Sequence, residues 1–77
     1  MQIIGNMFCQ CQEEVDSVLG KLKGLPVEVK AFGFGIDVEY TPSDTQTDAE
    51  AEKTAARLID IIESVKIHGF SQMAEKR

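Results

Sequence analysis

The sequence predicts a small α+β domain in which two helices cover one face of an antiparallel sheet. Two segments place apolar residues at helical spacing, and the stretch between them alternates apolar and polar residues. The resulting order is β-α-β-β-α, with a short C-terminal stretch that has room for a final strand. A chain of 77 residues builds one hydrophobic core, so residues 1–77 are expected to form a single domain. Packing both helices on one sheet face is the economical way to bury these apolar surfaces.

The first half of the chain predicts a strand followed by a helix. Residues 1–7 (MQIIGNM) form a short apolar run, as expected of a strand. Residues 10–23 repeat apolar side chains at i, i+3, i+4 and i+7, which defines one helical face. The members of this face are Val15, Val18, Leu19 and Leu22. Gly24 and Pro26 mark the end of the helix.

Residues 27–40 predict two strands joined by a tight turn. Val27, Val29 and Ala31 form one alternating set, and Ile36, Val38 and Tyr40 form a second set of the opposite parity. The apolar positions therefore change from odd-numbered to even-numbered residues within residues 32–35 (FGFG). If the strand continued straight through this stretch, its apolar side chains would move to the opposite face of the sheet. A glycine bulge or a hairpin explains the change, and we favour the hairpin.

The second half predicts a long helix after a polar loop. Thr47 and Glu50 match a capping box, so the helix should begin there, and it is expected to run to about residue 67, with Gly69 as its C-terminal cap. Its expected buried face consists of Ala51, Ala55, Leu58, Ile59, Ile62 and Val65. Residues 71–77 are only weakly β-like, so they are expected to add a short edge strand or to stay loose.

Composition excludes several classes of function. The net charge of −5, the absence of Trp and the single Tyr disfavour nucleic-acid binding, which needs cationic and stacking side chains. No apolar stretch approaches a membrane span, and the N-terminus does not resemble a signal peptide. One His without a recognisable catalytic set argues against an enzyme. The expected protein is cytoplasmic, with a protein partner or a second copy of itself, no nucleic acid and no membrane insertion.

The most informative residues are two cysteines separated by a single residue, Cys9-Gln10-Cys11, where the first strand meets the first helix. Cysteines this close cannot join distant segments, and a reducing compartment favours metal or redox roles for paired thiols. A helix N-terminus stabilises a thiolate, and two soft sulfur ligands suit Cu(I) or Zn(II). The alternatives are two small buried hydrophobes and, with an awkward geometry, a redox pair.

Three stretches resemble the heavy-metal-associated domain of copper chaperones and metal-transporting ATPases. Residues 5–11 (GNMFCQC) are similar to the family's G-M-x-C-x-x-C loop, and residues 36–43 (IDVEYTPS) to its V-x-V-x-Y-D-P-S strand. Gly69 and Phe70 correspond to the Gly-Tyr after the second helix. This chain departs from the family in having one residue fewer between the cysteines and a longer stretch from Pro42 to Gly69.

The resemblance implies a ferredoxin-like βαββα(β) sandwich and a soft-metal site. Cys9 and Cys11 would be the thiolate ligands, and Met7 would anchor their loop in the core. His68 would be a third ligand or would tune the thiolate charge; alternatively it is a surface residue favoured by the negative end of its helix. The function implied is a metallochaperone-like module that passes Cu(I) or Zn(II) by ligand exchange. The alternative is a non-catalytic interaction or regulatory module that has the same fold but has lost metal binding. Its partner would be another protein or a second copy of the chain.

Overall fold

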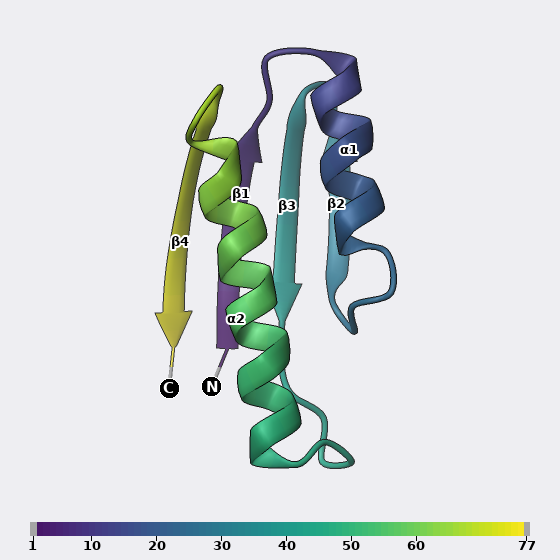
Figure 1. The fold of residues 1–77 in the computed structure, drawn as a ribbon, viewed down its shortest axis with the longest axis vertical. Helices are drawn as coiled ribbons and strands as arrows, with labels where there is room; N and C mark the ends of the chain where they lie inside the picture. The colour runs from purple at the N-terminus through teal and green to yellow at the C-terminus, as the bar shows by residue number, and fades with distance from the viewer. Residues whose placement is uncertain (1, 77) are drawn as a thin grey trace.

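The computed structural model describes residues 2–76, which form a four-stranded antiparallel sheet and two helices (Figure 1). The elements follow the chain as β1 (Gln2–Phe8), α1 (Gln12–Leu22), β2 (Glu28–Phe32), β3 (Gly35–Tyr40), α2 (Asp48–Val65) and β4 (Phe70–Lys76). The strand order is β2-β3-β1-β4, and each neighbouring pair is antiparallel. This arrangement confirms the predicted α+β sandwich and is compatible with a ferredoxin-like topology.

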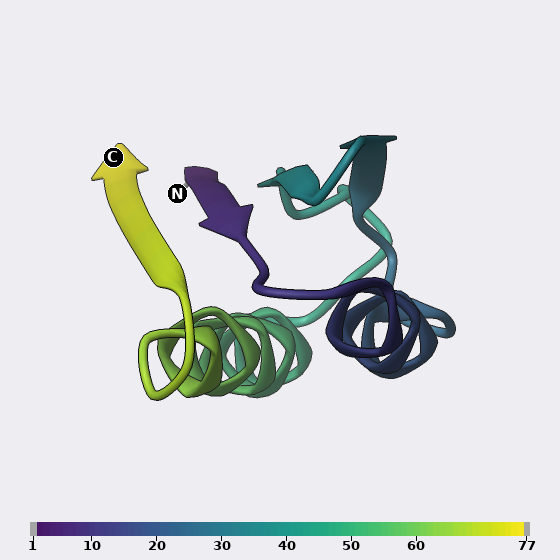
Figure 2. The same ribbon diagram turned by 90° about the horizontal axis from the view of Figure 1, so that it is seen from above.

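The molecule has two layers, because both helices lie against the same face of the sheet (Figure 2). We call the opposite face of the sheet the outer face, and no helix of residues 2–76 lies over it. Alternation along the strands sorts side chains between the two faces. Ile3, Met7 and Ile36 point to the helices and are fully buried, whereas Phe8 points to the outer face. The sheet therefore has one packed face and one open face.

The core is mainly aliphatic, and its only aromatic side chain is Tyr40. Tyr40 is fully buried, and its hydroxyl donates a hydrogen bond to Oε1 of Gln46 at 2.8 Å. Both helices contribute the buried faces that the apolar spacing predicts, except that Ile61 is buried in α2, whereas Ile59 and Leu19 are only partly buried. None of the four phenylalanines belongs to this core.

The predicted hairpin is present between β2 and β3. Phe32 pairs with Gly35, which leaves Gly33 and Phe34 as a two-residue turn. Gly33 has φ of 58°, the left-handed value that the first central residue of a type II′ turn requires. The turn reverses the chain and accounts for the change in the apolar pattern. Val29 faces Val38 and Ala31 faces Ile36, as the two alternating sets predict, although β2 is exposed along its length as an edge strand.

Helix α2 begins as predicted and ends slightly earlier than predicted. The Thr47 side chain accepts a hydrogen bond from the Glu50 N–H at 3.2 Å, which confirms Thr47 as the N-cap. The Glu50 carboxylate accepts a hydrogen bond from the Thr47 hydroxyl, in place of the Thr47 backbone N–H that the predicted capping box would use. The last helical residue is Val65, and the C-cap is Lys66. The prediction of Gly69 as the C-terminal cap is therefore wrong. Gly69 instead lies beside β1, where a Cβ atom would collide with the Phe8 carbonyl oxygen.

The C-terminal residues form an edge strand as far as residue 76, so of the two alternatives expected for residues 71–77 the strand is the one present, and it is longer than expected. Strand β4 pairs with the whole of β1, from Phe70 opposite Phe8 to Lys76 opposite Gln2. Pairing with a central strand outweighs the weak intrinsic β-propensity of this segment, because propensity depends strongly on context. Arg77 lies outside the described residues.

Candidate functional site

Three connections meet at one end of the sheet, shown at the top of Figure 1. They are the β1–α1 connection with both cysteines, the β2–β3 turn, and the α2–β4 connection with His68. The strand register brings them together, because Phe8 at the end of β1 lies opposite both Gly35 and Phe70. The predicted site residues therefore come from two connections at the same end of the molecule.

Cys9 is held in the core at the start of the β1–α1 connection. Only 7% of its surface is exposed, and its backbone N–H donates to the Phe34 carbonyl at 2.9 Å, which fixes the connection to the hairpin turn. Burial raises the pKa of the Cys9 thiol above its usual value of 9.0, and the charges of Glu14 and Cys11 raise it further. The neutral thiol is therefore the favoured form of Cys9 in this protein.

Cys11 is exposed and occupies the N-cap position of α1. Its backbone carbonyl accepts a hydrogen bond from the Val15 N–H at 3.2 Å, while its side chain makes no capping hydrogen bond. The sulfur therefore remains available to an external ligand near the positive end of the helix dipole. Both cysteines are free thiols. The motif thus combines one sulfur held in the core with one sulfur open to solvent.

His68 lies in the turn between α2 and β4 and is exposed. Its backbone N–H donates to the Val65 carbonyl at 3.2 Å, so the turn is ordered by the end of the helix. Among residues 2–76, no three His, Cys, Asp or Glu side chains are grouped closely enough to hold a metal ion. His68 is therefore not part of a preformed site with Cys9 and Cys11, and its role as a ligand stays a prediction.

The donor chemistry restricts the kind of metal site that this end could form. A structural zinc site needs four ligands, and the described residues supply two cysteine sulfurs without a preassembled third group. Two thiolates are suitable soft ligands for Cu(I). Two cysteine sulfurs alone would leave coordination positions of such an ion open, which a structural zinc site does not.

Sequence reasoning missed a row of aromatic side chains beside the cysteines. Phe32, Phe8 and Phe70 lie in one cross-strand row on the outer face, with Gly35 between the first two. They are 52%, 47% and 55% exposed, respectively. The rings of Phe8 and Phe70 have centroids 6.2 Å apart and are tilted by 45°. We call these three residues the aromatic row, and Phe34 in the adjoining hairpin turn is also 50% exposed.

The glycine within the aromatic row lets one ring lie flat on the sheet. A Cβ atom at Gly35 would stand 2.7 Å from Cε2 of Phe32, so only a glycine leaves room for this ring. A signal for the row was present in the sequence, because Phe8 is out of phase with the buried Ile3 and Met7. Recognising the whole row also required the register of all four strands, and the sequence does not specify that register.

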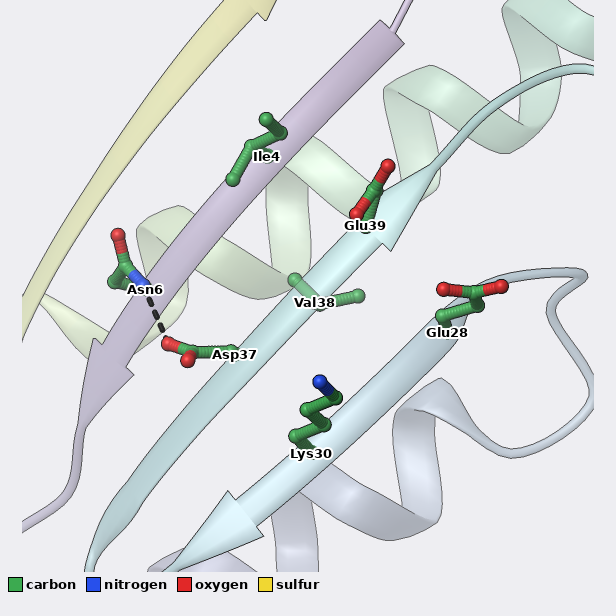
Figure 3. Close-up of a pocket in the computed structure, with 7 residues that line it drawn as sticks. All are labelled: Ile4, Asn6, Glu28, Lys30, Asp37, Val38 and Glu39. Atoms are coloured by element: carbon green, nitrogen blue, oxygen red, sulfur yellow. Dashed lines mark hydrogen bonds between the residues drawn. The ribbon is translucent and has the colours of Figure 1, made fainter.

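A shallow hollow lies further along the outer face, away from the cysteines (Figure 3). It has a volume of about 220 Å³ and is lined mainly by polar side chains from β1, β2 and β3. The Asn6 amide donates a hydrogen bond to the Asp37 carboxylate across its floor. Lys30 projects from the neighbouring strand β2 beside this pair, and Glu39 lies further along β3, on the strand that carries Asp37. The hollow is a solvated polar stretch of sheet surface.

Comparison with protein-family models, curated proteins and solved structures finds no match to this chain. Neither helix of residues 2–76 is long and apolar enough to cross a membrane. Function therefore has to be inferred from the chemistry of the residues at the cysteine end of the sheet.

Proposed function

We propose that this protein is a non-catalytic cytosolic module that binds one soft metal ion, Cu(I) in the first place and Zn(II) in the second, through Cys9 and Cys11. The ion is cargo, and it passes to a partner protein by ligand exchange. The observation that supports this most is the placement of two free thiols at the N-terminus of α1. A single residue separates the two cysteines, and one thiol is buried while the other is exposed. The resemblance to the heavy-metal-associated domain supports the same function.

The two cysteines have different roles in this proposal. Cys9 is anchored by the core and by the hydrogen bond to Phe34, so it keeps the ion at a fixed place. Cys11 is exposed, so a thiolate of the partner replaces it first. Each thiol releases its proton to solvent when its sulfur binds the metal. Since burial raises the pKa of Cys9, the affinity for Cu(I) should increase with pH as this proton becomes easier to remove.

The test is a titration of the reduced protein with Cu(I) in competition with a chromogenic chelator. We expect one equivalent of copper per chain for the wild type and none for the Cys9→Ser, Cys11→Ser double variant. Circular dichroism of the double variant checks that the fold is intact. His68→Ala serves as a matched control, because it keeps both sulfurs and measures any contribution of the third predicted ligand. A wild-type protein that binds no copper under reducing conditions would overturn the proposal.

The second candidate function is a protein-interaction module that does not depend on metal, and the aromatic row favours it. Large aromatic side chains dominate interface energetics when they are buried by a partner. Here three of them lie together on an open sheet face, about half exposed. In this case the cysteine double variant keeps its partner, whereas Phe8→Ala with Phe70→Ala loses it. The two functions are therefore separable by one pair of variants.

A further inference from the structure

The two edges of the sheet differ in how well they are protected against pairing with another chain. Strands β2 and β4 form the edges, and within residues 2–76 each is bonded on one side only. An unpaired edge is a template for a further strand unless charges, bulges or a short length block it. The edges therefore have to be compared residue by residue.

Strand β2 is protected by its central lysine. It spans five residues, and a two-fold antiparallel pairing that engages all five centres on Lys30. That pairing places Lys30 directly opposite Lys30 of a second copy. Like charges in this position are destabilising, and lysine is the residue that most often guards an edge. The β2 edge is therefore unsuited to pairing with itself.

Strand β4 lacks such protection over most of its length. It spans seven residues, and its charged side chains, Glu75 and Lys76, are confined to its last two positions. The central residues Gln72, Met73 and Ala74 are uncharged. Met73 belongs to the helix-covered face, because it lies opposite the buried Gly5, yet it remains 39% exposed at this edge. The edge thus presents an apolar side chain that nothing within residues 2–76 covers fully.

We propose that two copies of this chain pair through β4, antiparallel about a two-fold axis at Met73, to form a continuous eight-stranded sheet. Both copies must direct their helices to the same side, so outer-face residues have to oppose outer-face residues. Among the registers that meet this condition, only the one centred on Met73 engages all seven residues of β4. The opposed pairs are Phe70 with Lys76, Ser71 with Glu75, Gln72 with Ala74, and Met73 with itself.

The chemistry of this register is self-complementary. No charged side chain faces one of like sign, and the ammonium group of Lys76 comes next to the Phe70 ring of the second copy, where a cation–π contact is favourable. The exposed Met73 side chain is covered by its own copy. Because of the two-fold axis, every opposed pair other than Met73 with Met73 occurs twice, as in other closed homodimers. The register uses Phe70 from the cysteine end but neither cysteine, because both lie in the β1–α1 connection, so dimerisation is independent of the proposed metal function.

The test introduces charges at Gln72 and Ala74, two exposed outer-face residues that lie opposite each other in the proposed dimer. Gln72→Glu with Ala74→Glu opposes two pairs of like charges, and we expect the dimer dissociation constant to rise about tenfold or more. Gln72→Lys with Ala74→Glu opposes unlike charges and should keep or strengthen the dimer. In a register centred on residue 72 or residue 74, this second variant would instead place two lysines or two glutamates opposite each other. Light scattering over a concentration series and circular dichroism measure assembly and fold.

Several results would overturn the proposal. They are a wild-type chain that stays monomeric from micromolar to millimolar concentration, open polymers in place of a dimer, and weakening of the dimer by both variants alike. A dimer that neither variant affects would show that another surface pairs. The Cys9→Ser, Cys11→Ser variant should remain dimeric. Loss of copper binding without loss of the dimer, or the reverse, therefore identifies which proposal has failed.

Discussion

The two cysteines illustrate how residues two positions apart acquire different chemistry. Cys9 continues the inward-facing set of β1 side chains and is buried, whereas Cys11 begins α1 and is exposed. Desolvation disfavours the charged form of a group, so the pKa of the Cys9 thiol is raised. This asymmetry follows from the change from strand to helix within the motif. It suits an ion that must be held at one sulfur and reached at the other.

The difference in exposure predicts a difference in reactivity. With iodoacetamide near neutral pH, Cys11 should be alkylated first and Cys9 much more slowly, because the buried thiol has to become accessible and lose its proton. Mass spectrometry of proteolytic peptides at successive times measures both rates. In denaturant the two rates should converge. Equal rates in the folded protein would contradict the burial of Cys9.

The raised pKa of Cys9 also predicts an alkaline loss of stability. In the unfolded chain the thiol deprotonates near its usual value of 9.0, whereas the folded chain retains the proton to higher pH. The stabilisation is therefore fully present below the unfolded pKa and is lost as pH rises through the folded pKa. Urea unfolding at a series of pH values should show a steeper alkaline decline for wild type than for Cys9→Ala. Cys11→Ala, which retains Cys9, is the matched control. Parallel stability profiles of the wild type and Cys9→Ala would show that the folded state does not hold this proton.

At the scale of the elements, two glycines differ in whether the fold requires them. Gly69 brings the α2–β4 turn against the backbone of β1, whereas a Cβ atom at Gly20 in α1 would meet nothing within 4 Å. The first position fixes β4 beside β1 and thereby positions the aromatic row. The second position is an exposed helix interior, where glycine is unfavourable.

These positions predict opposite effects for the same substitution. Gly69→Ala should destabilise the fold by about 1–3 kcal/mol, because the methyl group meets a backbone carbonyl that cannot move aside. Gly20→Ala should stabilise it by up to about 1 kcal/mol through helix propensity. Denaturant unfolding of both variants measures the two free energies. Effects of the same sign would show that the α2–β4 turn does not pack against β1.

The elements with strong local signals could be predicted from the sequence. The N-cap at Thr47, the hairpin turn at Gly33 and the apolar faces of both helices each depend on neighbouring residues alone. The sequence left open whether residues 71–77 form a strand, and the length of β4 and the exact end of α2 could not be predicted, because they depend on the distant backbone of β1. In the candidate site the cysteine pair was visible, whereas the aromatic row required the register of strands far apart in the sequence.

At the scale of the whole molecule, the topology gathers the cysteines, His68 and the exposed aromatic side chains at one end. The antiparallel order brings the β1–α1 connection, the hairpin turn and the α2–β4 turn together, so the sulfurs, His68 and the exposed phenylalanines share that end (Figure 1). The β4 edge lies along the side of the sheet. The proposed ion site and the proposed pairing strand therefore lie on different elements of one small sheet.

The central claim is that Cys9 and Cys11 together hold the metal ion, and X-ray absorption spectroscopy of the copper-loaded, reduced protein tests it most directly. We expect one copper per chain with two sulfur neighbours, and loss of both sulfurs from the spectrum in the Cys9→Ser, Cys11→Ser variant. In His68→Ala the two sulfur neighbours should remain. Copper surrounded only by nitrogen or oxygen, or a sulfur signal unchanged in the double serine variant, would contradict the claim.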